Sequence, residues 1–216
     1  MLNSIIPFIR INRVSTAQIS DTLGKTGVIH GVRPITGQLH CVGQVRWIYA
    51  YGESNWDFHD QIRSARPGEI LLVEAFDCAE RAIFGSLVSK FLLLYRQVAA
   101  IIVLGNVRDA HHLIKERYPI WSVGITPLGC FNKILDHPFD ENLIRERREK
   151  YDGSIAVCDD SGVTIIPHTA LNQEFLDSLH RIEDQEDIWF DCIDRKKWDT
   201  YDTVCKKRYL QEMDEQ

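Results

Sequence analysis

The sequence predicts an α/β fold in which helices pack on a mainly parallel sheet, and two patterns carry this prediction. Between residues 69 and 123, apolar runs alternate with helical stretches in the order strand, helix, strand, helix, strand. By the rules for crossover connections, this order makes the strands parallel and packs the helices on the sheet. Two later runs, 154–158 and 163–166, flank a turn of Asp, Ser and Gly and predict a β-hairpin.

The elements up to residue 96 follow from capping, periodicity and turn signals. A hydroxyl cap at Ser15 and a glycine stop at Gly24 predict a first helix between them. Residues 41–51 predict a strand, and residues 69–74, after a Pro-Gly turn, predict a short buried strand. Apolar residues at helical spacing predict a helix over residues 79–96, with one apolar stripe against the sheet.

The next elements include the clearest buried strand of the chain. Residues 98–104 (VAAIIVL) lead into a predicted helix over residues 110–118, and residues 120–123 predict another short strand. In a parallel sheet the ligand usually lies outside the carboxyl ends of the strands. We therefore expect a binding site just after the strand at 98–104.

By composition the chain divides into a body, residues 1–180, and an extension, residues 181–216. A helix is predicted from about residue 170. In the extension 18 of the 36 residues are charged, yet Trp189 and Trp198 stand among them. Aromatic residues in a charged segment usually mark a contact surface, so we expect the extension to dock on the body or on a neighbouring subunit.

The overall composition narrows the function. The chain of 216 residues has 25 Lys and Arg against 31 Asp and Glu, a net charge of -6, which argues against a nucleic-acid-binding face. No apolar run reaches the length of a membrane span, and the amino terminus lacks the features of a secretion signal, so we expect a cytoplasmic protein. The 6 cysteines form no CxxC pair and predict reduced, structural thiols.

Arg108-Asp109 is the pair that points most clearly to function, because it ends the buried strand where a helix begins. An arginine there can grip a carboxylate through parallel hydrogen bonds, and the aspartate can hold a hard cation. The alternative is that Asp109 caps the helix and Arg108 is a surface charge. Gly85, in the preceding helical stretch, either exposes amides that receive a carboxylate or allows a tight contact between helix and sheet.

The histidines and the known nucleotide motifs give little support to other chemistry. His111 and His112 are adjacent on a helix and cannot both face one ion, so we expect them to be solvated. His59 is expected to have a structural or surface role. The sequence has no GxxxxGK[ST] phosphate loop, no GxGxxG after a strand and no GxSxG elbow, which argues against nucleotide enzymes and serine hydrolases.

Seven segments, taken in order, resemble the RraA-like family, which includes the regulator of ribonuclease E activity and the class II 4-hydroxy-4-methyl-2-oxoglutarate / 4-carboxy-4-hydroxy-2-oxoadipate aldolases. The segments are STAQISDTLGKTG, GVRPITG, NWDFHDQIRSARPGEILLVE, AIFGSLVSKF, VAAIIVLGNVRDA, PIWSVGITPLG and DGSIAVCDDSGVTIIP. They span most of residues 15–168. In addition, WDTYDTV resembles a Leu-Asp-Met-Tyr segment in the extension of the aldolases, and SNWDFH resembles their Asp-Asn-Trp stretch, which favours the aldolase branch.

The resemblance implies a layered sheet-and-helix fold related to phosphohistidine-swivelling domains, with a C-terminal helical extension. It implies assembly into homotrimers or hexamers with active sites between subunits. It also implies that a divalent ion, Mg²⁺ or Mn²⁺, is held by Asp109, and that the carboxylate of a pyruvyl group is bound by Arg108.

Further site residues follow from the same resemblance. The positions that match a substrate-binding Gly-Asp-Leu-Leu loop of the aldolases are Gly85, Ser86, Leu87 and Val88. An acidic residue from the tail of a neighbouring subunit would complete the outer metal shell, and the candidates here are Glu183 and Glu186.

These residue types suit a lyase that acts on a 2-oxo acid. Retro-aldol cleavage and oxaloacetate decarboxylation both leave a pyruvate enolate, which a cation chelated by the oxo and carboxylate oxygens stabilises. The sequence therefore predicts a metal-dependent lyase with a small 2-oxo acid as substrate. The alternative is a non-catalytic regulator that binds a protein partner such as a ribonuclease. Methyl transfer has little support, because no Gly-rich S-adenosylmethionine site follows the first strand.

The chain departs from the family pattern at several places. Ser86 stands where the aldolases have an Asp that is implicated in arranging metal-bound water and in proton transfer, and 21 residues separate it from Arg108, one more than the family spacer. Residues 74–78 replace the usual Gly-rich turn. Glu74, Asp77 or Glu80 could supply the lost carboxylate, although solvated charges are the expected role of all three.

Residues 141–151 (ENLIRERREKY) form a further departure. They predict a charged helix or lid where relatives carry an apolar strand.

Overall fold

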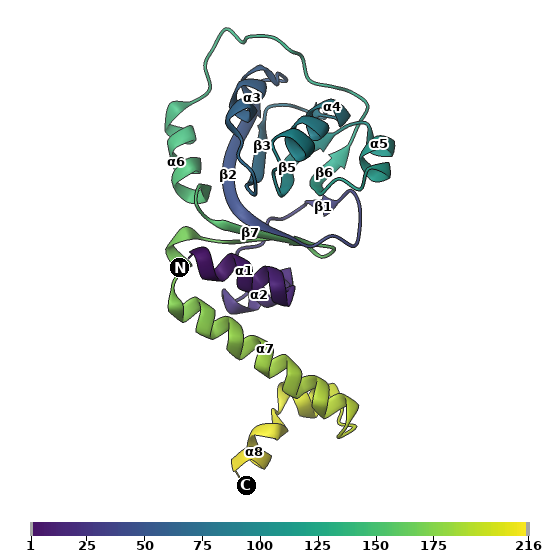
Figure 1. The fold of residues 1–216 in the computed structure, drawn as a ribbon, viewed down its shortest axis with the longest axis vertical. Coiled ribbons are helices and arrows are strands. Elements are labelled where there is room, and N and C mark those ends of the chain that lie inside the picture. Colours follow the sequence, from purple (N-terminus) through teal and green to yellow (C-terminus); the bar gives the residue numbers. More distant parts are fainter. Residues whose placement is uncertain (1, 215–216) are drawn as a thin grey trace. The chain divides into compact units, whose positions relative to one another are not determined.

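A computed structural model describes the backbone of residues 2–214 and the side chains of residues 4–211. The chain forms two compact units, of which the first runs to Asn172 and contains the sheet, and the second begins at Gln173 and is helical. Figure 1 shows the elements of both units. Residues 173–180, which the sequence analysis assigned to the body, belong to the first helix of the second unit.

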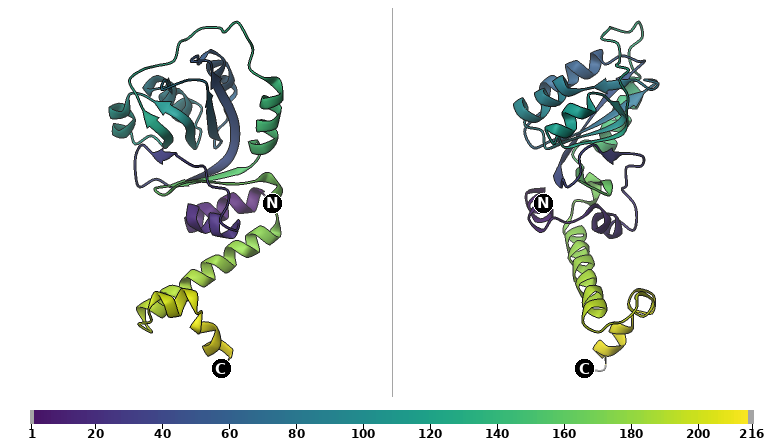
Figure 2. Two further views of the ribbon diagram at one scale, coloured as in Figure 1. Left: turned by 180° about the vertical axis from the view of Figure 1, so that it is seen from behind. Right: turned by 90° about the vertical axis from the view of Figure 1, so that its right-hand side faces the viewer.

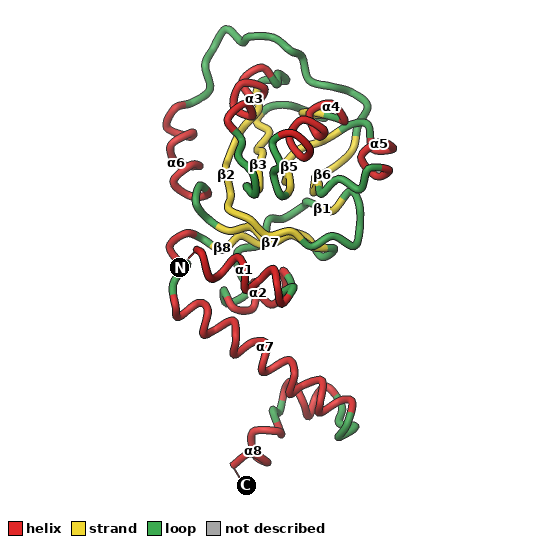
Figure 3. The backbone as a smooth tube through the Cα atoms, viewed as in Figure 1, coloured by secondary structure: helices red, strands yellow, loops and turns green. Residues whose placement is uncertain are grey.

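The strands gather at the centre of the first unit with helices around them (Figure 3). The strands are β1 (Arg33–Pro34), β2 (Cys41–Tyr51), β3 (Ile70–Phe76), β4 (Ala82–Phe84), β5 (Ala100–Val107), β6 (Ile120–Ile125), β7 (Ile155–Asp159) and β8 (Gly162–Ile166). The α-helices are α1 (Leu2–Asn12), α2 (Thr16–Thr22), α3 (Trp56–Gln61), α4 (Ser86–Lys90), α5 (Ala110–Lys115) and α6 (Glu141–Tyr151). Shorter helical turns are η1 (Ile62–Ser64), η2 (Phe91–Tyr95) and η3 (His168–Ala170).

The described strands belong to one 8-stranded sheet in the order β1-β6-β5-β3-β2-β7-β8, with β4 paired to β5. β2, β3, β5 and β6 are parallel neighbours, which confirms the parallel order predicted from the alternation over residues 69–123. β7 and β8 form the predicted antiparallel hairpin. The long, curved β2 joins the parallel strands to this hairpin, because its first residues pair with β7 and its later residues pair with β3 (Figures 1 and 2).

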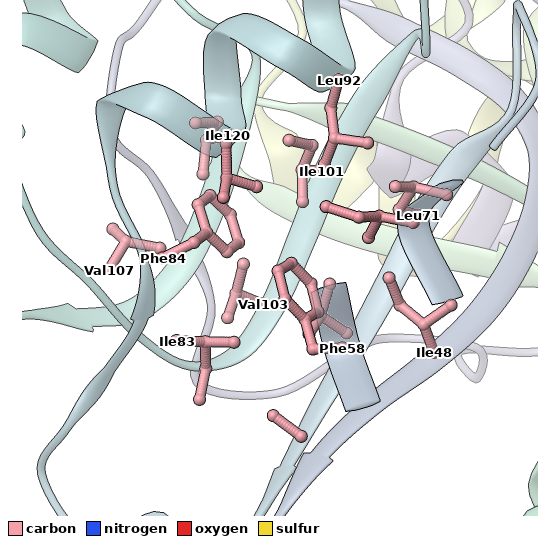
Figure 4. Packing of buried hydrophobic residues seen from close by; sticks show 14 of the residues in the cluster. Ile48, Phe58, Leu71, Ile83, Phe84, Leu92, Ile101, Val103, Val107 and Ile120 are labelled. Carbon is pink, nitrogen blue, oxygen red and sulfur yellow. The ribbon is translucent and has the colours of Figure 1, made fainter. Parts of the chain in front are cut away.

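The central strands are buried on both faces, as a parallel sheet requires. Along β3 and β5, alternate side chains enter two separate apolar clusters. The residues that enter one cluster are Leu71, Val73, Ile101 and Val103, and Figure 4 shows part of this cluster. The residues that enter the other cluster are Ile70, Leu72, Ala100 and Ile102. This period of two fixes which face of each strand meets which layer.

The crossover helices all cover the same face of the sheet. Phe58 of α3, Val88 of α4 and Leu113 of α5 pack in the cluster of Figure 4, and the ring of Phe58 stacks on Phe84 with centroids 5.6 Å apart. Right-handed crossovers between strands that advance in one direction place their helices on one side. The loops at the carboxyl ends of these strands remain outside the core, where they can build a site.

The helix predicted over residues 79–96 is wrong in its first part. Ala82–Phe84 forms β4, and the helix begins only at Ser86, with Gly85 as its N-cap. The backbone N–H of Ala82 donates to Leu128 O at 2.7 Å, and β4 pairs with the end of β5. These hydrogen bonds to distant segments override the local helical periodicity, which continues correctly through α4 and η2.

The predicted first helix is confirmed as α2, and its capping box is complete. The Ser15 hydroxyl accepts from the backbone N–H of Gln18, and the Gln18 side chain accepts from the backbone N–H of Ser15. The Asp159 carboxylate accepts two further hydrogen bonds from Thr16, one from its N–H and one from its hydroxyl, at 2.8 Å each. α2 is therefore tied to the end of β7. The preceding helix, α1, is not predicted by the sequence analysis.

The charged segment 141–151 is helical, as predicted, and is fastened to the sheet by a buried carboxylate. Glu74 of β3 accepts a hydrogen bond from Trp47 Nε1 at 2.6 Å. Arg147 of α6 approaches the same carboxylate oxygen, with Nε at 3.2 Å. Glu74 is therefore committed to the structure and is not the solvated charge that the sequence suggests.

The second unit consists of the long helix α7 (Gln173–Asp194), the turn η4 (Tyr201–Cys205) and α8 (Arg208–Asp214). Within it, the Trp198 ring lies 4.7 Å from Lys196 Nζ and 4.6 Å from Arg208 Cζ, so two cations pack on one indole. Throughout residues 2–214, every helix is too short or too polar to cross a lipid bilayer.

Replacing Glu74 tests its role as the anchor of α6. Glu74→Leu should lower the free energy of unfolding by about 2–4 kcal/mol, because Trp47 Nε1 loses its acceptor and Arg147 loses its ion-pair partner. Glu74→Gln keeps an acceptor for the indole and should cost less. Urea denaturation of the variants measures both effects, and wild-type stability of Glu74→Leu would contradict this role.

Candidate functional site

Arg108 and Asp109 follow β5 directly, at the carboxyl edge of the parallel strands, where the sequence predicts them. The backbone N–H of Arg108 donates to Phe84 O at 3.0 Å and joins this segment to the end of β4. Asp109 adopts the left-handed region with φ of 62°, which is uncommon for a residue other than glycine. The turn leaves both side chains exposed outside the core.

The Asp109 carboxylate does not cap the helix that follows it. Asp109 occupies the N-cap position of α5 but makes no capping hydrogen bond with its side chain. Instead its Oδ2 accepts two hydrogen bonds from Ser86, from the backbone N–H at 2.8 Å and from Oγ at 3.1 Å. These hydrogen bonds hold the pKa of Asp109 below its ordinary value, and the one from the Ser86 backbone has the larger effect. The carboxylate is therefore ionised across the neutral pH range.

Gly85 permits this contact for a steric reason. A Cβ atom on Gly85 would lie 2.2 Å from Asp109 Oδ2 and 2.8 Å from Arg108 Cγ. The tight contact that the sequence analysis considered therefore exists, and it is a contact with the two candidate site residues. Any other residue at position 85 would push both side chains away.

A cavity of 220 Å³ opens beside this contact. Its lining residues come from the start of α3, the end of β4, the start of α4, the segment after β5 and the loop 126–140. They are Asn55, His59, Ala82, Ile83, Phe84, Gly85, Leu87, Val88, Arg108, Asp109, Gly129, Cys130 and Asn132. We name this space the inner cavity. Ser86 does not line it but lies, with Arg108 and Asp109, on an adjoining open depression.

The loop 126–140 brings its residues to the inner cavity through backbone pairing. Gly129 forms a bridge with Ala82, and Phe131 N donates to Glu53 O at 2.8 Å. A Cβ on Gly129 would lie 2.6 Å from Arg108 Nη1, so the loop backbone packs directly on the guanidinium. The loop therefore limits the space open to the Arg108 head group on one side.

Asn55 contributes an unused acceptor to the inner cavity. Its Nδ2 donates to Ile83 O at 2.8 Å, while its buried Oδ1 has no hydrogen-bond partner among the described residues. The side chain is only 7% exposed. A buried carbonyl oxygen without a partner is costly, and a hydroxyl or N–H group of a ligand would satisfy it.

His59 also lines the inner cavity, and burial lowers its pKa below the ordinary value of histidine. The imidazole is therefore neutral at pH 7 and can accept a proton. The sequence analysis expected a structural or surface role for His59, and the structure instead brings it to the same cavity as Arg108 and Asp109.

Among the described residues that line the inner cavity, the one carboxylate that could bind a divalent cation is that of Asp109. Within the described part of the chain, no three His, Cys, Asp or Glu side chains lie together as a metal site would require. His111 and His112 are exposed, as predicted. Both hydrogen bonds from Ser86 go to Asp109 Oδ2, and no described residue donates to Oδ1. Mg²⁺ keeps several waters and needs few protein ligands, so the ionised Asp109 fits such an ion as a single protein ligand.

The acidic residues considered as additions to the site lie elsewhere. Asp77 and Glu80 are exposed, and Glu74 is bound to Trp47 and Arg147. Glu183 and Glu186 lie on α7 in the second unit.

Burial raises the pKa of Glu183, and its Oε2 lies 3.9 Å from His180 Nδ1. A contact of Glu183 or Glu186 with the metal site of a neighbouring subunit stays a prediction.

Sequence reasoning did not place Asn55, His59, Gly129, Cys130 or Asn132 in the site. For the first two, the SNWDFH stretch carried a signal, since it resembles a segment of the aldolases. The other three lie in a loop without periodicity, and its course over the sheet depends on pairing with β4.

A family model described as RraA-like: Aldolase/RraA matches residues 16–165, which include Arg108, Asp109 and the segment 85–88. Among solved structures, an uncharacterized protein from Pseudomonas syringae pv. tomato is similar with a TM-score of 0.71 and 20% identity, over 95% of this chain and 94% of that one.

Two further neighbours carry names. Streptomyces coelicolor RraAS2, called an unusual member of the RNase ES inhibitor RraA protein family, has a TM-score of 0.66 and 21% identity over 85% of this chain and 94% of its own. The RNA-processing inhibitor RraA from Thermus thermophilis has a TM-score of 0.56 and 19% identity over 71% of this chain and 93% of its own. At these identities the likeness shows the fold.

Gly85→Ala tests the close approach on which the site is built. The added methyl group should displace Asp109 and Arg108 and lower the free energy of unfolding by about 1–3 kcal/mol. Gly37→Ala is a matched control, since a Cβ there would lie 3.5 Å from Asp160 Oδ1, an ordinary contact. Thermal unfolding of both variants measures the difference, and equal melting temperatures would contradict the steric argument.

Ser86→Ala tests the cause of the lowered pKa of Asp109. It removes the hydroxyl donor but keeps the backbone donor, so the pKa should rise part of the way to its ordinary value. A carboxyl group whose pKa is lower in the folded than in the unfolded chain stabilises the fold at pH values above its unfolded pKa, and this stabilisation is lost as the pH falls through the folded pKa. Because the folded pKa is higher in the variant, the variant should lose this stabilisation at a higher pH than the wild type. Carboxyl ¹³C titration by NMR measures the pKa, with Asp202 of the second unit as an internal reference. An unchanged Asp109 titration would exclude the hydroxyl as a cause.

Proposed function

The chain belongs to the RraA-like (Aldolase/RraA) family, and from this premise we propose that it is a divalent-metal-dependent lyase that cleaves a carbon–carbon bond of a 2-oxo acid. The observation that carries the proposal is the meeting of Arg108, ionised Asp109 and Gly85 on one inner cavity at the carboxyl edge of the sheet. A guanidinium and a carboxylate within one small cavity suit a substrate that carries both a carboxylate and oxygen atoms able to chelate a metal.

Arg108 binds the carboxylate of the substrate in this proposal. Its guanidinium is packed against Gly129, which limits its freedom and favours one orientation. Leu87 and Val88 lie in the first turn of α4. The first backbone hydrogen bond of that helix comes after them and runs from Ser89 N to Gly85 O. Leu87 and Val88 both line the cavity, and in this proposal their backbone N–H groups supply further donors to the same anionic end of the substrate.

Asp109 would hold the metal ion. When bound there, Mg²⁺ or Mn²⁺ supplies Lewis-acid polarisation of the oxo group beside the bond that breaks. The role of the chain is to keep the Asp109 carboxylate ionised and fixed, which the two hydrogen bonds from Ser86 accomplish. The oligomeric assembly and the completion of the outer metal shell by Glu183 or Glu186 of a neighbouring copy are part of the same proposal.

Ser86 affects which cleavage the site can support. Retro-aldol cleavage requires a base that removes the proton of the substrate hydroxyl group, whereas loss of CO₂ from oxaloacetate requires none. Ser86 is a hydrogen-bond donor to Asp109 and cannot be that base. Neutral His59 is the residue of the inner cavity that suits this role, and Asn55 Oδ1 suits the positioning of the same hydroxyl group.

Pyruvate release with and without metal tests the proposed function. The wild type should release pyruvate from oxaloacetate and from 4-hydroxy-4-methyl-2-oxoglutarate with Mg²⁺ or Mn²⁺ and not with EDTA. Asp109→Ala should reduce this release by roughly 100-fold or more while the circular dichroism spectrum is unchanged. Asp21→Ala is the matched control and should keep full activity. It removes an exposed aspartate of α2 that forms an ion pair with Lys25.

Two outcomes would count against the lyase function. Metal-independent release that survives in Asp109→Ala would remove Asp109 from the site. No release from either substrate with any metal, together with no binding of pyruvate, would favour a protein-binding role, and affinity capture with a ribonuclease as the bait would then test the alternative.

A further inference from the structure

A further hollow, distinct from the depression at Ser86, lies next to the inner cavity and shares two of its residues. It is an open depression of 430 Å³ lined by Trp56, Asp57, His59, Asp60, Arg63 and Asn132. His59 and Asn132 also line the inner cavity, so the two spaces lie next to each other at these side chains. A ligand anchored by its carboxylate at Arg108 and too long for the inner cavity would extend past His59 onto this surface. We name it the outer depression.

The charges of the outer depression disfavour a second carboxylate. Two of its residues, Asp57 and Asp60, are acidic, and one, Arg63, is basic. Arg63 Nη1 donates to Asp60 Oδ1 at 2.8 Å, so this cation already has an acidic partner. His59 is neutral at pH 7. An anionic group there would face a net negative charge and would have to compete with Asp60 for Arg63.

Trp56 provides the apolar part of the outer depression. It is 47% exposed, although Phe58 on the same short helix is fully buried. Its backbone N–H donates to Ser54 Oγ at 3.2 Å, which helps to fix the start of α3. Among the described residues no aromatic ring stacks on the indole. An exposed indole beside a site offers a flat surface on which a planar group packs favourably.

We propose, resting on the lyase function above, that the outer depression binds the far half of the substrate and selects an uncharged aromatic group over a second carboxylate. The substrate class is then a 2-oxo acid with an aromatic tail. Arg108 anchors the 2-oxo acid end, and Trp56 stacks on the tail. Asp57 and Asp60 weaken the binding of dicarboxylates by like charge.

A pair of non-cleavable ligands tests this selectivity directly. 2-Oxo-4-phenylbutanoate and 2-oxoglutarate differ only in that a phenyl group replaces the far carboxylate, and pyruvate reports the inner cavity alone. Isothermal titration calorimetry with the full chain and Mg²⁺ should show the phenyl ligand binding about tenfold more tightly than 2-oxoglutarate.

Three variants separate stacking from charge. Trp56→Ala should weaken the phenyl ligand about tenfold and leave pyruvate unchanged, and Trp56→Phe should restore most of the loss. Asp60→Asn should strengthen 2-oxoglutarate several-fold, because it removes one negative charge and frees Arg63. Tyr95→Ala is the control, since Tyr95 is an exposed aromatic residue, 71% exposed, that lines neither space.

The outcomes distinguish the two proposals. If pyruvate binds but 2-oxoglutarate binds as tightly as the phenyl ligand, the selectivity is wrong and the lyase function stands. Equal weakening of all three ligands in Trp56→Ala would assign Trp56 a purely structural role and would overturn the stacking. If pyruvate itself does not bind, the carboxylate site at Arg108 fails, and the selectivity fails with it.

Discussion

The candidate site depends on one contact, in which the backbone at Gly85 lies against the carboxylate of Asp109. Only because position 85 has no side chain can the Ser86 N–H reach Asp109 Oδ2 at 2.8 Å. This hydrogen bond joins the start of α4 to the segment after β5, which are separate in sequence but adjacent at the edge of the sheet. It fixes the Asp109 side chain and lowers its pKa, and it leaves Arg108 beside the inner cavity.

The sequence was sufficient to predict the parallel centre of the sheet, the hairpin and the location of Arg108 and Asp109, because all three follow from strong local patterns. The run at 98–104 is apolar throughout, since β5 is buried on both faces, and an element of this kind must be central. Once its end is known, the rule that ligands bind at the carboxyl edge of parallel strands indicates the next residues. The family resemblance then assigned chemistry to a pair that position alone left open between a site and a helix cap.

The parts that the sequence could not predict are those decided by distant contacts. β4 spans only Ala82–Phe84, and its side chains fit the helical period of the residues that follow, so only its pairing with β5 and with the loop 126–140 makes it a strand. Pro7 argues against α1, yet the helix forms with Ile5 and Ile9 buried on one face. His59 and Asn55 belong to the site only because the same loop closes the cavity around them.

Ser86 has a physical consequence that joins the proposed function to the proposed selectivity. An aspartate at this position would place a second negative charge beside Asp109, whereas the serine donates a hydrogen bond to it. The site therefore has one carboxylate and one guanidinium, and a cation held by a single carboxylate is bound weakly until other oxygens chelate it. In the proposed function those oxygens come from the 2-oxo acid itself. Cation and substrate then stabilise each other's binding, so at substrate concentrations below saturation a tail held by Trp56 also raises the apparent affinity for the metal.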